Sequence, residues 1–462
     1  HGRDGTVPVL APAGFMEHAV SENVYAGTAM TRRAVYMYGS DLPKGPAGQI
    51  GCGLGATTST GTISLVPPTL GITRTGQRET VDGVEIVFQL TPGTEAPAEM
   101  NFLFPRHRAL CMAENATHTL HNILTLRGAL VRDPRIWAHY LSEAEDLFAG
   151  RADVAFASHH WPTWGREAIV GFLTTQRDLY TYLHDQTLRL LNQGLTGPEI
   201  AEDILLPPAL ETAWAARGYY GSVSHNVKAV YQRYMGWFDG NPAHLWEHPP
   251  VEQARRFTAD YGGIDALTAK GQQYAADGDL RFAATLLNHA VFAHPDHRPA
   301  REALARVYDR LGHGAENGTW RNFYLTAAME LRGTLAKVAV DIGNPEMAMA
   351  LTVDQLVDSL AIRVNGPRAW DLRLTLDWRL TDQDRAWRLT LSNGALTYRT
   401  RALDAQPGEP ADLTLTLSKP QLLGVLAGHG LDGVTVEGDP AVLARLFGVL
   451  DAPDSQFAIV TP

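Results

Sequence analysis

The sequence predicts a mixed protein in three parts: an α/β layer structure, an all-α region and a small α+β domain. Up to about residue 165, short apolar runs alternate with turns rich in Gly and Pro. From 166 to about 332, apolar residues recur at helical spacing, and after 333 they alternate strictly. A chain of 462 residues is also too long for one core, because single domains hold roughly 100–200 residues.

The first part contains five candidate strands and one long candidate helix. Residues Val84, Ile86 and Phe88 give the period-two alternation of a half-buried strand. A helix is expected over Asp133–Phe148, and an alternation of strand and helix favours an α/β layer structure. The expected strands are Val7–Ala11, Val84–Leu90, Met100–Pro105, Ala109–Met112 and Asp153–Ala157.

The second part contains successive amphipathic segments at Ile264–Ala276, Leu280–His294 and Pro299–Leu311. Their spacing is near that of a tetratricopeptide-like helical hairpin. One such unit cannot bury its own apolar face. We therefore expect these helices to pack on neighbouring helices or on a second subunit, and we expect a further apolar helix at Tyr231–Asp239.

The third part shows strict alternation from Leu372 to Leu380 and again from Trp387 to Leu391. Asn393-Gly394 is a strong two-residue hairpin turn. A strand at Leu413–Leu417 and a closing helix at Pro440–Leu450 complete a small α+β domain with a half-buried antiparallel sheet. This part contains no constellation of catalytic residue types.

Composition excludes several classes of protein. The net charge of −11 argues against a nucleic-acid-binding surface, which needs clustered Lys and Arg. No apolar run approaches the roughly 20 residues that span a bilayer. Two cysteines, Cys52 and Cys111, cannot form a disulfide framework. A site for a small anion remains compatible with these numbers.

Metal-ligating residue types gather where three expected strands begin or end. Glu95 and Glu99 precede the strand at Met100, Glu114 follows the strand at Ala109, and His159-His160 follow the strand at Asp153. Carboxylate oxygen and imidazole nitrogen suit Zn²⁺, and a carboxylate can bridge two metals. The alternative for any single Glu is a solvated surface residue. Because adjacent residues on a strand point to opposite sides, we expect one of the two histidines to have a structural role.

Four segments resemble bacterial alkyl sulfatases of the alkyl-sulfate-degrading type: TEAPAEM at 94–100, MAENATH at 112–118, HHWP at 159–162 and GYYGSVSHN at 218–226. The similarity extends over the whole chain in the same order. The resemblance implies part of a metallo-β-lactamase-like αββα catalytic domain at 1–188, a helical dimerisation domain at 189–333 and a sterol-carrier-protein-like domain at 334–462. It also implies a homodimer and a periplasmic or secreted location.

By the same resemblance, Glu95 is a ligand of one zinc ion, Glu114 bridges two zinc ions, and His159 is a ligand of the second. The family's remaining ligands come from a His-x-His-x-Asp-His motif, which this sequence does not contain. We expect that motif to precede His1, and we expect the 462-residue chain alone to be inactive.

Five further polar residues are candidates around the substrate. Arg127, expected on a helix after the second segment, could bind the sulfate oxygens; a surface arginine is the alternative. His118 or His121 could assist the leaving sulfate, although a capping or core role is equally open. Thr58 and Ser59 could donate hydroxyl contacts to an anion, or could only stiffen the Gly-rich loop around them.

The resemblance implies hydrolysis of alkyl sulfate esters to an alcohol and inorganic sulfate by a metal-bound hydroxide. Cleavage of the C–O bond is expected for at least some members of the family. The alternative is a lipid- or surfactant-binding homologue with an incomplete catalytic half. The absent motif favours that alternative, whereas intact Glu95, Glu114 and His159 favour the enzyme.

Overall fold

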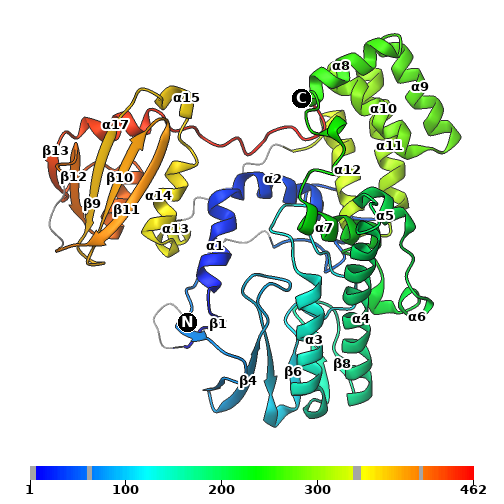
Figure 1. The fold of residues 1–462 in the computed structure, drawn as a ribbon, viewed down its shortest axis with the longest axis horizontal. Coiled ribbons are helices and arrows are strands. Elements are labelled where there is room, and N and C mark those ends of the chain that lie inside the picture. Colours follow the sequence, from blue (N-terminus) through cyan, green and yellow to red (C-terminus); the bar gives the residue numbers. More distant parts are fainter. Residues whose placement is uncertain (1–6, 60–64, 337–344, 405–408) are drawn as a thin grey trace.

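The computed structural model describes residues 7–59, 65–336, 345–404 and 409–462. Figure 1 shows three parts: an α/β region (blue to cyan), a group of helices (green) and an α+β domain (yellow to red) at the opposite end from the helices. The predicted mixture of α/β, all-α and α+β parts is confirmed by the order of helices and strands.

The α/β region is built on a six-stranded sheet whose strands follow chain order. The β6–β7 pair is parallel, and the other neighbouring pairs are antiparallel. A parallel pair needs a crossover connection, which α3 supplies at Pro134–Phe148. The strands are β3 Arg78–Val81, β4 Val84–Leu90, β5 Met100–Phe104, β6 Ala109–Cys111, β7 Val154–Phe156 and β8 Thr163–Trp164.

Two long helices cover this sheet. The side chain of Asp133 caps α3 by accepting from the N–H groups of Arg135 and Ile136, at 3.0 and 3.1 Å, a favoured arrangement at a helix N-terminus. Helix α4, Arg166–Leu191, lies beside α3. Trp137 of α3 and Tyr180 of α4 are almost fully buried and stack with ring centroids 4.7 Å apart. The expected strands at 84–90, 100–105, 109–112 and 153–157 and the helix at 133–148 are therefore confirmed within one or two residues.

A helical hairpin precedes the sheet and was not predicted. It consists of α1, Phe15–Tyr25, and α2, Gly27–Tyr38. The strand expected at Val7–Ala11 is shorter, β1 Leu10–Pro12, and it pairs in parallel with β2, Leu70–Ile72. The hairpin escaped prediction because α1 has no continuous apolar stripe: Val20 is 1% exposed, whereas Tyr25 at the end of the helix is 48% exposed.

The helical region runs from α5 to α12. The three predicted segments are confirmed as α9, α10 and α11. Helices α9 and α10 approach closely, because a Cβ on Gly271 would lie 2.6 Å from Cγ of Leu287. The helices are α5 Gly197–Asp203, α6 Pro208–Glu211, α7 Val223–Met235, α8 Pro250–Asp260, α9 Ile264–Asp277, α10 Leu280–Ala293, α11 Arg298–Gly314 and α12 Gly318–Arg332.

The α+β domain contains a five-stranded sheet in the order β11-β10-β9-β12-β13. The predicted alternation is confirmed, since Leu374, Leu376, Trp378 and Leu380 of β9 are all buried. The sheet is mixed rather than purely antiparallel, because β9 and β12 pair in parallel. Its elements are α13 Pro345–Ala350, α14 Val353–Ala361, α15 Gly366–Ala369, β9 Leu374–Leu380, β10 Arg385–Ser392, β11 Ala395–Ala402, β12 Leu413–Leu417, α16 Lys419–Leu426, β13 Thr435–Gly438 and α17 Ala441–Phe447.

Two expected helices are wrong in position. The segment from 113 to 133 is irregular, so Arg127 is not on a helix. Its backbone groups bond to other parts of the chain, for example the N–H of Leu120 to the carbonyl of Arg217 at 2.9 Å, and cannot also form a helical ladder. The helix expected to reach Asp239 ends at Met235, where Gly236 follows with φ 72°.

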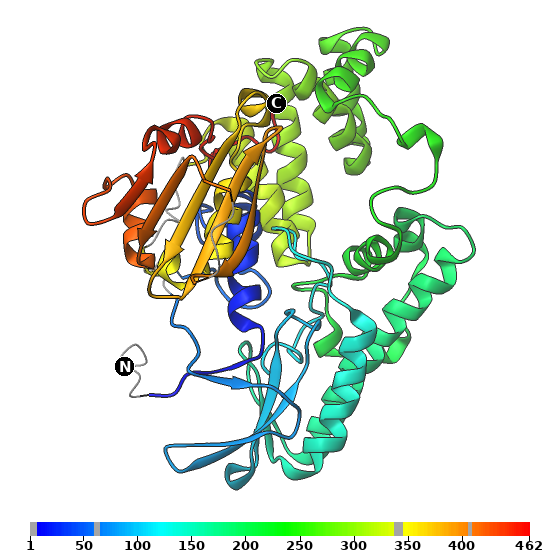
Figure 2. The same cartoon turned by 60° about the vertical axis from the view of Figure 1, so that its left-hand side comes forward.

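An extended segment, 236–249, joins α7 to α8 and stands away from the neighbouring helices (Figure 2, green). Its one regular element is a short 3-10 helix at Pro242–His244. Trp237 and Trp246 on this segment are 77% and 95% exposed. This segment therefore exposes apolar surface, whereas most apolar residues of α10 are buried.

Candidate metal centre

The candidate site lies where the parallel strands β6 and β7 end. Backbone bonds continue past the pair, from Met112 N to Phe156 O and from Ser158 N to Ala113 O, each at 2.8 Å. Ala113 adopts a left-handed conformation with φ 48°, which is uncommon for a residue with a side chain. This turn places Glu114 after β6 close to His159, which follows β7.

Three predicted ligands are brought together, and a fourth side chain joins them. Oε1 of Glu114 lies 3.5 Å from Nε2 of His159 and 3.0 Å from Nε2 of His121. Ligand atoms of Glu95, Glu114 and His121 lie within 4.8 Å of one another. Residues more than 60 positions apart in the sequence therefore form one cluster of two carboxylates and two imidazoles.

The second nitrogen of His121 indicates what the cluster can hold. Nδ1 lies 2.9 Å from the carbonyl oxygen of Asn122, so it carries a proton and donates it. In the neutral ring, Nε2 then presents a lone pair toward the carboxylate of Glu114 at 3.0 Å. Two electron pairs at this distance need a cation between or beside them, either a proton or a metal ion. The donor set suits Zn²⁺, and a backbone carbonyl on the other ring nitrogen is the usual support of a metal-binding histidine.

Glu95 is fixed by Arg132. The guanidinium of Arg132 donates to both the carboxylate and the backbone carbonyl of Glu95. The same guanidinium donates to the side-chain and backbone oxygens of Asn122, at 2.5 and 3.1 Å. Arg132 is largely buried, so Glu95, Asn122 and, through Asn122, His121 are held in a single network.

The electrostatics of the cluster are set by burial and by these contacts. Burial alone would raise the pKa of Glu114, but its hydrogen bonds to His121 and His159 outweigh burial and hold that pKa well below the usual range. The hydrogen bond with Glu114 in turn raises the pKa of His159. Burial raises the pKa of Glu99 to about 8, with Glu95 and Glu114 adding to the shift. Glu114 is therefore the ionised acceptor at the centre, whereas Glu99 is mostly protonated at neutral pH.

His160 has a structural role, as expected for one member of the pair. It adopts φ 67°; its Nε2 lies 3.0 Å from the carbonyl of Gly53, and its Nδ1 accepts from the backbone N–H of His118 at 3.1 Å. The Gly-rich loop can reach His160 because Gly53 packs directly on the backbone of Tyr219, where a Cβ would clash.

His118 lies apart from the carboxylates. Its ring stacks between Trp161 and Phe172, with centroids 4.8 and 4.6 Å away, and its Nε2 lies 3.1 Å from Oγ1 of Thr163. Burial lowers the pKa of His118. The geometry gives this residue a packing environment, and the predicted role in assisting the leaving group stays a prediction.

A cavity of about 560 Å³ lies beside Glu95. Its wall combines three guanidinium groups with apolar side chains from α1 and α2. Each guanidinium has a carboxylate partner: Arg132 has Glu95, Arg233 has Asp133 at 2.8 Å, and Arg127 has Glu22 at 3.3 Å. The apolar part of the wall includes Phe15, Ala19, Met30, Ala34, Leu130, Val131 and Ile136.

The remaining predicted substrate contacts divide between this cavity and the surface. Arg127 lines the cavity and also donates to the carbonyl of Gly128 at 2.9 Å. Thr58 and Ser59 are exposed in an irregular loop and are not part of the cavity wall. Their role as anion contacts stays a prediction.

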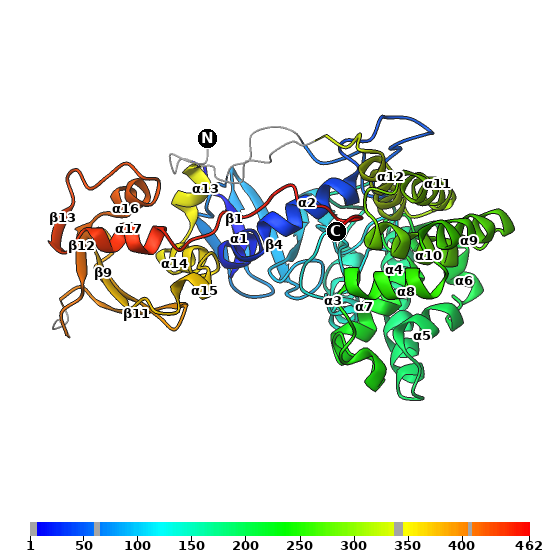
Figure 3. The same cartoon turned by 90° about the horizontal axis from the view of Figure 1, so that it is seen from above.

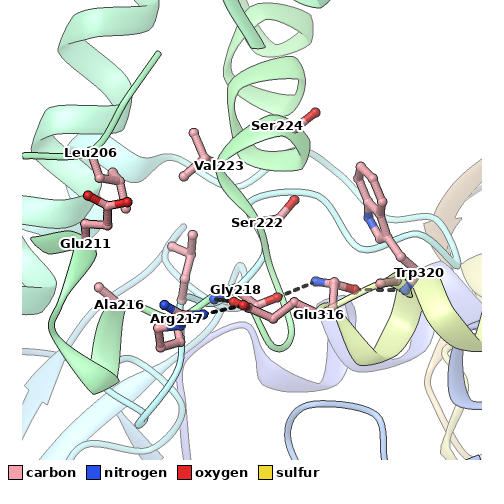
Figure 4. Close-up of a pocket in the computed structure, with 13 residues that line it drawn as sticks. Leu206, Glu211, Ala216, Arg217, Gly218, Ser222, Val223, Ser224, Glu316 and Trp320 are labelled. Atoms are coloured by element: carbon pink, nitrogen blue, oxygen red, sulfur yellow. Dashed lines mark hydrogen bonds and ion pairs between the residues drawn. The ribbon is translucent and has the colours of Figure 1, made fainter. Parts of the chain in front are cut away.

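A second cavity, of about 480 Å³, lies at the start of α7 and α12 (Figure 4). At its wall Arg217 forms an ion pair with Glu316, which also accepts from the N–H of Gly218 at 3.2 Å. The wall contains none of the four clustered side chains. Of the four, Glu95 lines the first cavity, and we therefore place the candidate substrate site there.

Sequence reasoning did not assign His121 to the ligand set and did not find Arg132 or Asn122. The spacing of His118 and His121 drew attention to both histidines but could not tell which one faces Glu114. Arg132 has no local signal, because its partner Glu95 lies 37 positions away.

Comparison with known proteins gives family matches over most of the chain. Residues 196–334 match the model of the alkyl sulfatase dimerisation domain, and residues 341–462 match that of the alkyl sulfatase C-terminal domain. A linear primary-alkylsulfatase of Pseudomonas sp. is 45% identical over 99% of this chain and 68% of its own length. An (R)-specific secondary-alkylsulfatase, also of Pseudomonas sp., is 43% identical over 99% of this chain and 70% of its length.

A solved structure also matches the fold of this chain. The structure of a stereoselective inverting sec-alkylsulfatase of Pseudomonas sp. superposes with a TM-score of 0.95 at 42% identity, over 99% of this chain and 73% of that one. The similarity to alkylsulfatases in sequence and in fold therefore defines a sulfuric ester hydrolase. Within that class, the chain belongs to the alkylsulfatase family.

None of the helices in the described ranges combines the length and the apolar character that crossing a bilayer requires.

Proposed function

We propose that this protein hydrolyses alkyl sulfate esters to an alcohol and inorganic sulfate at a zinc site that includes Glu95, Glu114 and His159. The observation that carries the proposal is the position of the Glu114 carboxylate, 3.0 Å from His121 and 3.5 Å from His159, in a chain of the alkylsulfatase family. Glu114 is the residue suited to bridge two metal ions, and His121 adds a nitrogen that the sequence-based ligand set did not include.

Zinc held by these side chains supplies activation of water at neutral pH and neutralisation of negative charge. The chain's own residues orient the site. Arg132 fixes Glu95, and the carbonyl of Asn122 fixes the ring of His121.

The cavity beside Glu95 is the proposed substrate site. Arg127 is the guanidinium best placed to receive the sulfate, because its contact with Glu22 is long, at 3.3 Å, and only partly buried, so an anion can replace that partner. A guanidinium matches sulfate oxygens in a bidentate manner. The apolar side chains of α1 and α2 on the same wall receive the alkyl chain.

The domain limits of 1–188, 189–333 and 334–462 belong to the same proposal, with a metallo-β-lactamase-like first part and a sterol-carrier-protein-like third part. The match of 196–334 to the alkyl sulfatase dimerisation model supports a homodimer. The exposed tryptophans on the 236–249 segment are the surface we assign to it.

Sulfate release from dodecyl sulfate by the full-length protein tests the proposal. We expect release that a chelator abolishes and that added Zn²⁺ restores, with zinc content measured on the same samples. Binding of dodecyl sulfate without any release would contradict the proposal and would favour the lipid- or surfactant-binding alternative.

A further inference from the structure

The carboxylate of Glu330, near the end of α12, lies where three distant parts of the chain meet. Its Oε2 accepts from Nη2 of Arg32 at 2.8 Å and from the hydroxyl of Tyr36, both on α2. Its Oε1 accepts the backbone N–H groups of Ile459 and Val460, each at 2.9 Å. The side chains of Glu330 and Arg32 are only 11% and 7% exposed. One buried carboxylate therefore joins α12, α2 and the last residues of the chain.

Those last residues form what we call the C-terminal strap, residues 451–462. It leaves the α+β domain after α17 and runs alongside α2 to reach α12 (Figure 3, red). The carbonyl of Phe457 accepts from Nε of Arg32 at 2.9 Å, and Val460 is buried in a core cluster with Tyr36. The strap contains no helix or strand, so these contacts are what hold it in place.

Helix α2 faces both the strap and the proposed substrate cavity. Arg32 and Tyr36, four positions apart, point toward Glu330. Met30 and Ala34, also four positions apart, line the cavity beside Glu95. Residues at i and i+4 share one side of a helix, and a step of two residues turns by about 200° at 3.6 residues per turn. The two pairs, two positions apart, therefore occupy opposite sides of α2. Any displacement of α2 at Glu330 therefore moves the cavity wall.

The α+β domain also contacts the other helix of the hairpin. The hydroxyl of Tyr25, at the end of α1, donates to Oδ2 of Asp358 on α14 at 2.8 Å. Phe15 at the start of α1 lines the same cavity wall. The domain thus holds α1 through α14 and α2 through the strap.

We propose that Glu330 is a positioning residue for recognition of the alkyl chain: together with the C-terminal strap it fixes α2, and α2 fixes the apolar wall of the substrate cavity. This inference rests on the proposed function. It assigns to a residue of the helical region and to the last residues of the chain a part in substrate selection.

Removal of the strap leaves Oε1 of Glu330 and Nε of Arg32 without the partners described above. A buried donor or acceptor that loses its partner is costly to the fold, and α2 shifts to reach new partners or water. Contacts between the wall and an alkyl chain are made equally in the ground state and in the transition state. Their loss therefore raises KM and leaves kcat nearly unchanged.

The test uses three forms of the full-length protein: Glu330→Gln, a protein that ends at Asp454, and the two changes combined. With dodecyl sulfate we expect KM to rise about tenfold in each form and kcat to stay within about twofold. With a short-chain alkyl sulfate we expect both constants to stay within about twofold. The combined form should be no worse than either single form, because the two changes break the same contact.

Glu302→Gln is the matched control. Glu302 pairs with Arg306 and Arg332 on exposed helix surface, with its side chain 43% exposed, and contacts neither α2 nor the strap in the bonds described. We expect wild-type constants from it. If the shortened protein does not fold, Arg32→Lys replaces it, because lysine keeps the charge but lacks the two separate nitrogens, Nε and Nη2, with which Arg32 bonds Phe457 and Glu330.

Hydrogen exchange of α2 in the same proteins separates this inference from the proposed function. Faster exchange at 27–38 in the protein that ends at Asp454, together with the chain-length-dependent KM, supports the inference. Unchanged exchange there, or an equal loss for short and long substrates, overturns it. A wild-type protein that releases no sulfate overturns the proposed function instead, and the exchange of α2 then decides whether the strap holds the helix.

Discussion

At the scale of single residues, the site depends on how one carboxylate satisfies two imidazoles. Glu114 accepts from, or shares a cation with, His121 and His159, and the pKa of Glu114 is held below its usual range by those contacts despite burial. His121 cannot turn away, because its other nitrogen is bonded to the carbonyl of Asn122. The site is therefore pre-organised for a cation.

Replacement of Glu114 by Gln tests that organisation. The amide offers one oxygen and no charge, so we expect zinc binding by the full-length protein to weaken at least about 100-fold, since even the loss of an outer partner of a ligand costs about 10–100-fold. Sulfate release should fall together with zinc binding. Atomic absorption measures the zinc content, and sulfate release is measured at saturating zinc. Glu85→Gln, at an exposed ion pair with Arg78, is the control and should match wild type.

Glu99 gives a prediction about pH in the metal-free protein. Its pKa is raised by burial from 4.5 to about 8. The folded chain therefore holds this proton more tightly than the unfolded chain, and the stabilising contribution is lost as pH rises from about 4.5 to about 8. Glu99→Gln mimics the protonated carboxyl and removes this dependence. We expect the variant to match wild type at pH 4.5 and to exceed its stability by on the order of 2 kcal/mol at pH 9.

Urea unfolding in the presence of a chelator, at both pH values, measures this difference. An equal gain at pH 4.5 and pH 9 would show that the substitution improves packing and that titration of Glu99 is not its cause.

At the scale of helices and strands, prediction succeeded where burial follows a simple period. Strand β9 and helices α9 to α11 each bury one regular face, and their limits were predicted within a few residues. Helix α1 was not predicted, because it has no single buried face. One of its sides lines the cavity beside Glu95, and another contacts α14. The helix predicted within 113–133 is absent, because the backbone groups of this segment bond to residues distant in sequence, such as Arg217.

The same distinction applies to the site. Glu95, Glu114 and His159 follow from a resemblance carried by local segments, and the structure brings them together. The sequence could not tell that His121, and not His118, joins the cluster, because this depends on how the two rings are oriented. The ring of His121 is oriented by the carbonyl of Asn122, and the ring of His118 by stacking on Trp161. Neither ring orientation can be predicted from a periodic pattern in the sequence.

Helix α7 provides a prediction at this scale. His225 is buried in it and contacts two other elements: its Nε2 bonds the carbonyl of Leu124, and its Nδ1 accepts from the indole of Trp320 at 3.3 Å. Burial lowers the pKa of His225 from 6.5 to about 4. The neutral ring is therefore the folded form, and its contribution to stability is lost as pH falls from about 6.5 to about 4.

We expect His225→Gln to be about 1–2 kcal/mol less stable than wild type at pH 7.5, since two hydrogen bonds are disturbed. Between pH 6.5 and pH 4 the variant should lose about 3 kcal/mol less than wild type does. Denaturant unfolding across that range measures both effects. His107→Gln, at an exposed position, is the control and should retain the wild-type pH dependence of stability. If the stability of this control also depended less on pH, the effect could not be assigned to His225.

At the scale of the whole molecule, the α1–α2 hairpin contacts all three parts. The hairpin lines the cavity beside Glu95, contacts α14 of the α+β domain through Tyr25, and contacts α12 of the helical region through Arg32. The α+β domain holds no metal-ligand cluster among its described residues. Its described contacts toward the site run through Tyr25 of α1 and through residues 451–462, which bond Arg32 of α2 and Glu330 of α12.

The two exposed tryptophans of the 236–249 segment give the last prediction. Trp237 and Trp246 lie on the 236–249 segment, 77% and 95% exposed, within the residues that match the dimerisation model. Burial of one such side chain is worth about 1.5–3 kcal/mol, and a two-fold interface counts each change twice. Trp237→Ser with Trp246→Ser should thus weaken the dimer by more than about 1000-fold. Trp370→Ser, 64% exposed but on the α+β domain, is the control. Sedimentation at micromolar concentration should give a monomer for the double variant and a dimer for the control. A dimer in both would place the interface elsewhere on the helical region.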